Sequence, residues 1–191
     1  MSELNKVNGK IQHLRKVNQT YLKQIKSLLE ERNIESQLRM HSYFSYAVTI
    51  KHDRKGGNFI LGSYHVLNNG SVALTNPHIC IKLPRDNKIE FSGKYAYKNK
   101  LHNAKMQEGW ERMDESNETK EIWLKPVNKQ ILKPYESLVF PDFQIQWPSD
   151  ERYAYSIQGF IYGNELQEGS PSLNQINING IVAKGDEEDG I

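Results

Sequence analysis

Six histidines and one cysteine are the side chains of this sequence best suited to hold a metal ion or to act as a nucleophile. The histidines stand at positions 13, 41, 52, 65, 78 and 102, and no two have the HxH, HxxxH or HExxH spacing that places two ligands on one metal. Cys80 lies between Ile79 and Ile81 in a short apolar run, where a thiol is a poor nucleophile. We therefore expect no metal site and interpret Cys80 as a small core residue.

The acidic side chains of residues 108–118 are a further set that could gather a divalent cation: Glu108, Glu111, Asp114, Glu115 and Glu118. Their spacing lacks the alternating ligand order of a calcium loop, which favours a solvated loop. The sequence also contains no GxSxG, P-loop or GxGxxG motif. These absences predict a protein that is not an enzyme and that binds no cofactor.

Aromatic side chains offer a different chemistry, because a ring can stack on a sugar or pack against another protein. Tyr95, Tyr97, Trp110 and Met113 lie within residues 95–120, the least regular part of the sequence, and long irregular loops are often functional. We predict that these four residues bind a partner, most simply another protein. Trp110 is the best candidate for an exposed contact.

Two further tryptophans, Trp123 and Trp147, fall in runs where apolar and polar residues alternate, so we expect them in the core. The three tryptophans and ten tyrosines could also supply a stacking platform, with Trp110 as its exposed ring, which leaves an alternative function open. In that alternative the protein is a carbohydrate-binding module that uses its exposed aromatic residues.

The element that organises the chain is a helix expected over residues 1–40. Apolar residues recur there at spacings of three and four, and no proline interrupts them. Written as a heptad, the a and d positions are Leu4, Val7, Ile11, Leu14, Asn18, Tyr21, Ile25 and Leu28. Four heptads in register predict a coiled coil through which copies of the chain associate.

Asn18, at a central a position, favours a parallel pair, because a buried amide can pair with its twin and fix the register. Val17, Leu22 and Leu29 lie at g and e positions and widen the apolar stripe. The sequence thus predicts a homodimer or homotrimer, with packing of the helix on its own β domain as the alternative. Residues 1–40 carry eight Lys or Arg and four Glu, which we assign to a solvated face rather than to nucleic-acid binding.

From residue 41 to residue 183 the apolar period changes from helical to alternating, which predicts a β domain. About eight to ten short strands separated by turn residues are typical of an antiparallel sandwich. The sequence NNG at 68–70 suits a hairpin connection, and residues 163–171 are expected to form a loop. Residues 184–191 are acidic and predict a disordered tail.

Three motifs in this domain resemble bacterial immunoglobulin-like adhesion and transport modules. They are VLNNG at 66–70, NPHICIKLP at 76–84 and LKPYES at 132–137, and the resemblance covers roughly residues 55–147. The sequence departs from the family at Tyr135, where such modules usually have glycine. The resemblance implies an immunoglobulin-like sandwich used as a spacer or interaction module. We therefore expect a mainly β protein, an Ig-like or jelly-roll sandwich preceded by one long coiled-coil helix.

The longest apolar runs are too short to span a bilayer, and the first residues lack the basic and apolar regions of a signal peptide. One cysteine cannot form an internal disulfide, which fits a reducing compartment. We therefore expect a non-enzymatic scaffold without a membrane partner. It would act in the cytoplasm as an adaptor, or as a phage-type structural component of a virion.

Overall fold

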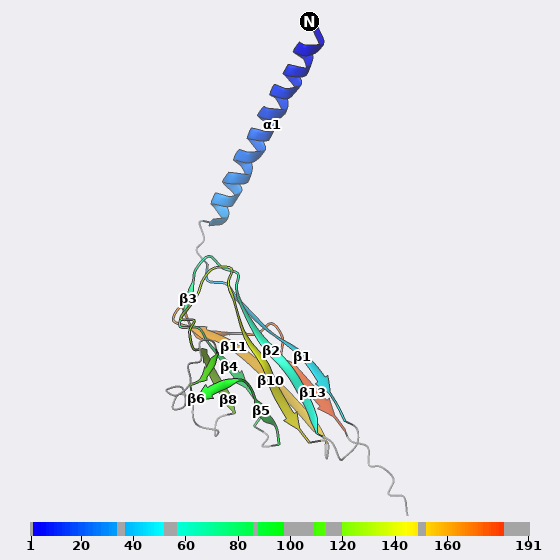
Figure 1. Ribbon diagram of the computed structural model, residues 1–191, viewed down its shortest axis with the longest axis vertical. Helices are drawn as coiled ribbons and strands as arrows, with labels where there is room; N and C mark the ends of the chain where they lie inside the picture. The colour runs from blue at the N-terminus through cyan, green and yellow to red at the C-terminus, as the bar shows by residue number, and fades with distance from the viewer. Residues whose placement is uncertain are drawn as a thin grey trace, which may run out of the picture. The chain divides into compact units, whose positions relative to one another are not determined.

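The computed structural model describes residues 2–33, 37–51, 57–85, 88–97, 109–113, 120–148 and 152–181 (Figure 1). The chain divides into two compact units, Met1–Gln37 and Leu38–Ile191, and each is described by itself. The prediction of a mainly β chain with one N-terminal helix is confirmed. The acidic tail predicted at residues 184–191 lies outside the described residues, as do Glu108, Asp114, Glu115 and Glu118 of the acidic set.

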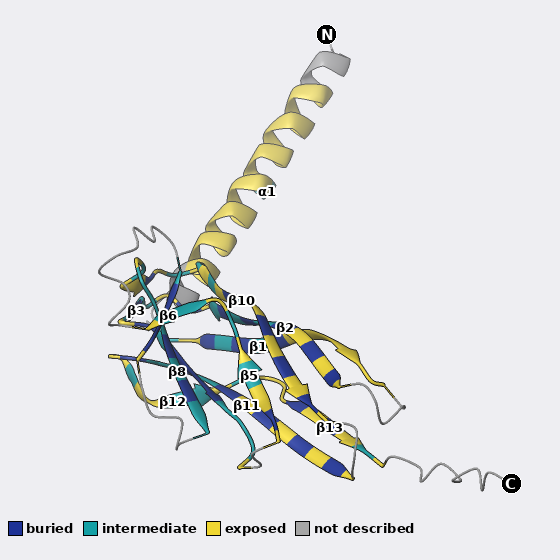
Figure 2. Cartoon of the chain, turned by 60° about the horizontal axis from the view of Figure 1, so that its bottom comes forward, coloured by how far each residue is buried: buried dark blue, intermediate teal, exposed yellow. Residues whose placement is uncertain are grey.

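The first unit contains the helix α1 (Ser2–Asn33), whose Leu, Lys, Gln and Glu residues have high helix propensity. Its described side chains, from Lys6 to Leu29, are exposed apart from that of Val17, which is partly buried (Figure 2). A lone helix of this length is only marginally stable in water, because nucleation is costly and none of the described residues of the unit covers its apolar side chains. Among the described residues, no helix is long and apolar enough to cross a membrane.

The second unit begins at the edge of a four-stranded sheet. Its spatial order is β1 (Met40–Thr49), β2 (Asn58–Asn68), β10 (Ser137–Trp147) and β5 (Glu90–Ser92), and all neighbours are antiparallel. The register between β2 and β10 shifts between Phe140 and Phe143. Pro141 lies at this shift. A proline has no N–H to donate, and at the shift no regular hydrogen bond between β10 and β2 is lost.

The other large sheet follows the order β12 (Leu166–Pro171), β11 (Tyr153–Gly163), β4 (His78–Lys82), β8 (Glu121–Pro126), β7 (Trp110–Arg112) and β6 (Tyr95–Tyr97). Strand β13 (Ile176–Gly180) also pairs with β11, and β3 (Leu74–Thr75) pairs with β9 (Ile131–Leu132). The β6–β7 pair is parallel, so the predicted antiparallel arrangement has one exception among the described strand pairs.

The two large sheets share one core, as the surroundings of Gly159 on β11 show. A Cβ at this position would overlap the rings of Tyr64 on β2 and Phe44 on β1. The Tyr64 hydroxyl donates to Oγ of Ser42 at 2.8 Å, and burial raises the pKa of Tyr64 well above its usual range. Apolar side chains from both sheets pack in the same core: Ile60, Ile79, Ile81, Leu124, Phe140, Phe143, Ile145, Trp147, Ile157 and Ile161.

Three local expectations differ from the structure. Strands β6 and β7 form within the segment expected to be irregular, and β12 replaces the loop expected at residues 163–171. These strands are short or rich in Gly, Ser, Gln and Glu, which have low β propensity, so their pairing partners decide their conformation. Residues 68–70 do not close a hairpin either, since β2 pairs with β1 and β10 rather than with the next strand.

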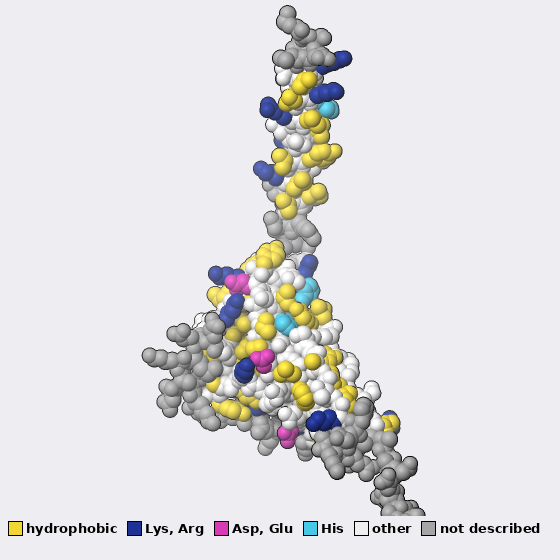
Figure 3. Space-filling model, turned by 45° about the vertical axis from the view of Figure 1, so that its right-hand side comes forward, with side chains coloured by type: hydrophobic (Ala, Val, Ile, Leu, Met, Phe, Trp, Pro, Cys, Tyr) yellow, Lys and Arg dark blue, Asp and Glu magenta, His cyan; other side chains and the backbone are white. Residues whose placement is uncertain are grey.

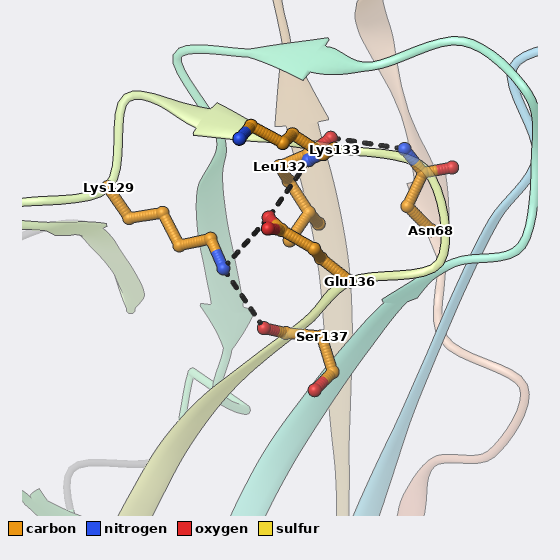
Figure 4. Close-up of polar contacts among 6 residues, drawn as sticks. All are labelled: Asn68, Lys129, Leu132, Lys133, Glu136 and Ser137. Atoms are coloured by element: carbon orange, nitrogen blue, oxygen red, sulfur yellow. Dashed lines mark hydrogen bonds and ion pairs between the residues drawn. The ribbon is translucent and has the colours of Figure 1, made fainter.

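The side chain of Asn68 explains the last difference, because it holds two separate turns together (Figure 4). The N–H of Gly70 donates to its Oδ1 at 3.0 Å, and its Nδ2 donates to the carbonyls of Val72 at 2.8 Å and Leu132 at 3.1 Å. In addition, the N–H of Tyr135 donates to the Asn68 carbonyl at 2.8 Å. The VLNNG and LKPYES motifs are therefore joined in one polar junction through Asn68, whose side chain is buried.

Glu136 completes this junction (Figure 4). Its Oε2 accepts the N–H of Lys133 at 3.1 Å and lies 3.1 Å from Nζ of Lys129. The hydrogen bond from Lys129, and after it the one from the Lys133 backbone, lowers the pKa of the Glu136 carboxyl. The turn residue between them, Tyr135, has a φ of 63°.

Candidate functional site

The apolar stripe of α1 is the first candidate site. Figure 3 shows hydrophobic side chains along the helix, with Lys and Arg beside them. All the seam residues with described side chains are exposed, from 42% for Ile11 to 64% for Leu28: Val7, Ile11, Leu14, Asn18, Tyr21, Ile25 and Leu28. The side chain of Leu4 is outside the described part of the helix. Such a stripe contains no catalytic group, and its chemistry suits packing against another helix.

The g and e residues next to Asn18 extend this stripe. Leu22 and Leu29 are 58% and 54% exposed, and Val17 is partly buried. A stripe of this width exceeds the a and d seam of a two-stranded coil. The geometry of α1 is therefore compatible with more than one neighbouring helix.

The second predicted site, Tyr95, Tyr97, Trp110 and Met113, is divided by the structure. Tyr95 pairs in register with Trp110, and Tyr97 with Arg112. The Arg112 guanidinium lies 5.9 Å from the ring centroid of Tyr95 and 5.8 Å from that of Tyr97, within cation–π range. Burial, followed by the neighbouring Tyr97, raises the pKa of Tyr95, while Arg112 acts in the opposite direction.

The prediction that Trp110 makes an exposed contact is wrong. Its side chain is 5% exposed, and its ring meets the edge of Phe140 at a centroid distance of 5.4 Å. The indole N–H donates to the carbonyl of Val139 at 3.0 Å, so the one polar atom of the ring is satisfied inside the protein. An irregular local sequence does not tell on which side of a strand a ring lies. The ring of Trp110 faces the other sheet, where it packs against Phe140.

Met113 and Tyr97 are the exposed members of that set, at 47% and 36%. Met113 borders a hollow of about 350 Å³ on the opposite face of the sheet, together with His78, Glu111 and Lys125. Lys125 Nζ lies 3.4 Å from the Glu111 carboxylate. This hollow is lined by polar and apolar groups in similar measure, so a ligand there could pack on apolar surface while the polar groups fix its orientation.

A group that the sequence analysis missed borders this hollow. The outer aromatic cluster consists of His78 on β4, Trp123 on β8, and Phe160 and Tyr162 on β11, all partly exposed. The ring centroids of Trp123 and Tyr162 are 4.9 Å apart, and His78 stacks on Tyr162 at 5.6 Å. The predicted core position of Trp123 is therefore wrong, because the alternation of β8 does not tell which of its faces is the inner one.

Charged side chains flank the outer aromatic cluster. Lys82 and Glu121 form an ion pair at 3.0 Å, and the Trp123 indole donates to Glu121 at 3.1 Å. Cys80, whose strand neighbours are Trp123 and Phe160, is fully buried, which confirms it as a small core residue. In the part of the chain that the structure describes, no three His, Cys, Asp or Glu side chains gather as metal ligands would.

The likeness to known proteins is found among solved structures and is distant. No protein-family model matches the sequence, and no curated protein matches it. Among solved structures, the crystal structure of a FixG-related protein from Vibrio parahaemolyticus aligns over 76% of this chain and 96% of its own, with 9% identity and a TM-score of 0.35. A TM-score this low carries no argument about fold or function.

Proposed function

We propose that this chain is a non-enzymatic, homo-oligomeric interaction protein. Its helix α1 joins copies as a parallel coiled coil, and its β unit, an immunoglobulin-like sandwich, binds another protein. Such a molecule would work as a cytoplasmic adaptor or as a structural component of a virion. Joining copies raises apparent affinity, because several weak sites then act together without any new contact.

The exposed stripe of α1 is the observation that carries this proposal. The described apolar a and d residues keep 42% to 64% exposure over three heptads, and the described residues of the unit form no second helix that could cover them. Because the buried apolar area stabilises a helix pair, such a stripe gains most by packing on a copy of itself. The amide of Asn18 selects a parallel, in-register arrangement in which it meets its twin. The widened stripe at Val17 and Leu22 supports three strands as well as two.

The mass of the full chain in solution tests this proposal. Light scattering should give a multiple of 22.2 kDa, and a variant with Ile11→Asp and Ile25→Asp should be monomeric. Gln12→Asp with Lys26→Asp is the matched control, since both residues lie at outer heptad positions and should leave the mass unchanged. A monomeric wild-type chain would show that the stripe does not join copies.

Asn18→Leu tests the orientation and the number of strands. If Asn18 lies at a parallel seam, leucine there should change the strand number or relax the register, and it should raise the melting temperature because a buried amide is removed. An unchanged mass together with an unchanged melting temperature would place Asn18 outside the seam.

A second candidate function is carbohydrate binding, favoured by the outer aromatic cluster. Trp123 and Tyr162 present partly exposed rings next to His78, which lines the hollow of about 350 Å³. Glu111, Lys125 and Asn76 offer hydrogen-bonding groups in that hollow. Stacking rings with polar groups around them are the chemistry that holds a sugar. This candidate moves the site away from Trp110, which is buried.

A glycan panel read by tryptophan fluorescence tests the second candidate. Trp123→Ala should abolish any response, whereas Trp110→Phe, a change within the core, should preserve it. A panel without any response in the wild-type chain would leave the protein-binding function as the one supported.

A further inference from the structure

The second half of β1 leaves part of the inner face of its sheet uncovered. In the first half, Met40, Ser42 and Phe44 point inward and are buried. Tyr46 and Val48 continue on the same face, and Ile50 follows the strand, yet they are 40%, 40% and 43% exposed. On β2, Tyr46 pairs in register with Gly62 and Val48 with Ile60, and Ile60 is fully buried. Apolar side chains of the core face thus reach the edge of the sandwich without a cover among the described residues.

The backbone of β1 shows the same division. β1 is an edge strand (Figure 1), so half of its N–H and C=O groups point away from β2. The chain itself pairs the first of them: Leu173 N–H donates to the Ser42 carbonyl at 2.7 Å. The side chain of Asn174 then accepts the N–H of Phe44 at 2.7 Å and donates to its carbonyl at 2.9 Å.

The register fixes which groups come next along this edge. Pairing of β1 with β2 runs without a shift from Met40 to Thr49, so the outward direction recurs at every second residue. Tyr46 and Val48 therefore direct their N–H and C=O groups outward as Phe44 does. Among the residues that the structure describes, none pairs with them.

We propose that this segment, Tyr46 to Ile50, is a docking edge that takes an extended segment of a partner protein as an added strand. The inference deepens the proposed function and rests on it in one respect, because it names how the β unit would bind its protein partner. Strand addition supplies backbone hydrogen bonds for affinity and side-chain pockets for specificity. Here the specificity comes from the exposed rims of Tyr46, Val48 and Ile50, which favour apolar side chains at every second position of the guest.

The length of the connection between the two units disfavours a second copy of β1 as the guest. Antiparallel pairing of two β1 strands centred on Val48 would set their Met40 residues about 53 Å apart. From Asn33 to Met40 the chain reaches about 24 Å at full extension, so two connections and a coiled coil about 10 Å wide allow about 58 Å. Such pairing within one coiled coil would need both connections almost fully stretched, at a large cost in conformational entropy.

Binding of short peptides to the full chain tests the inference. The probe is a fluorescein-labelled heptapeptide library with Val, Ile, Leu, Phe or Tyr at every second position and Ser, Thr or Lys between them. The control library has the same composition with apolar residues at helical spacing. We expect polarisation to rise with the alternating library only, and we expect bound peptide to slow hydrogen exchange at the amides of Tyr46 and Val48.

Three variants locate the binding. Val48→Pro removes an outward N–H that does not bond to β2, so the guest strand loses a hydrogen bond. Val48→Lys replaces an apolar side chain beside the guest strand with a charge, so an apolar contact is lost. Each variant should weaken peptide binding about tenfold or more. Thr49→Lys adds the same charge on the outer face of β1 and should leave binding unchanged. Melting followed by circular dichroism identifies any variant that fails to fold. If Val48→Pro fails to fold, Val48→Lys alone tests the binding site.

The inference is overturned if neither library binds at about 1 mM, if binding survives both Val48 variants, or if exchange slows elsewhere. It is also overturned if Val48→Lys lowers the mass measured by light scattering, because the guest is then a second copy. Failure of the coiled coil is a separate result, read from the mass of the Ile11 and Ile25 variant, and does not alter peptide binding.

Discussion

The amide of Asn68 donates to the carbonyl of Leu132 at 3.1 Å, across 64 residues of sequence, at a site where Asn68 is fully buried. The same side chain binds Val72 and Gly70, so one residue joins two turns that carry separate motifs. A buried polar group that makes all its hydrogen bonds lowers the stability of the fold little. Removing it lowers the stability much more, because its former partners stay buried without a hydrogen bond.

Asn68→Ala should therefore destabilise the β unit by about 3 kcal/mol, because three backbone groups lose their partner and two of them are buried. The measurement is the urea midpoint of unfolding. The neighbouring Asn69→Ala is the control, since Asn69 is exposed and its side chain bonds to the ring of His41 at 2.7 Å rather than to buried backbone groups. Equal effects of the two substitutions would contradict the role given to Asn68.

Asn174→Ala should cost about 1 to 2 kcal/mol, because the N–H and carbonyl of Phe44 lose their hydrogen bonds at the margin of the core. It should also speed hydrogen exchange at the Phe44 amide. Asn177→Ala on β13 is a matched control: Asn177 is exposed, and its side chain bonds to no described residue. Unchanged exchange at Phe44 in the Asn174 variant would refute the contribution of this side chain.

Tyr135→Gly should stabilise the protein by about 1 kcal/mol, since Tyr135 has a φ of 63°, a left-handed conformation in which a Cβ is strained. Its ring is 81% exposed, so little packing is lost. Asn76 and Asp142 also have positive φ, but their side chains tolerate it. Tyr135→Ala removes the ring and keeps the Cβ, so it should leave the urea midpoint nearly unchanged. A gain from alanine equal to that from glycine would mean that the ring, not the backbone, is the source.

The carboxyl of Glu136 should contribute to the loss of stability in acid. Its folded-state pKa is lowered, mainly by Lys129, so the contribution is fully present above the unfolded-state pKa of about 4.3 and is lost as the pH falls through the folded-state value. Glu136→Gln should flatten the dependence of the urea midpoint on pH in this window. Lys129→Met should raise the pKa of Glu136 in a side-chain NMR titration. An unmoved Glu136 titration would exclude Lys129 as the main cause.

The strands that alternate over many residues are the ones the sequence predicts well. Tyr46 and Val48 indicate β1, and Ile145 and Trp147 indicate β10, because every second residue faces a core. Short strands escape prediction: β6 and β7 have three residues each, too few for a period to be read. Their neighbours in the sheet, rather than their own residues, hold them in place.

The candidate sites also differ in how far the sequence predicts them. The stripe of α1 is read from the sequence, since a heptad depends only on local spacing. Trp123 was expected in the core and lies on the outer face, because alternation separates two faces without telling which of them is covered. Trp110 was expected to be exposed in an irregular loop, and its burial follows from a strand pairing that its local sequence does not indicate. The docking edge of β1 begins where the hydrogen bonds from Leu173 and Asn174 to the earlier part of the strand end. Asn174 is 130 positions away from its partner Phe44 in the sequence, so local patterns do not reveal this limit.

The sequence by itself determined one long helix with an apolar stripe, a mainly β remainder, and the absence of any known catalytic motif, because these follow from local period and residue type. Tertiary structure decided which rings are buried, which turns Asn68 joins and where the edge of β1 stays open. These features depend on contacts between segments far apart in the chain, and only the packing of the two sheets fixes those contacts.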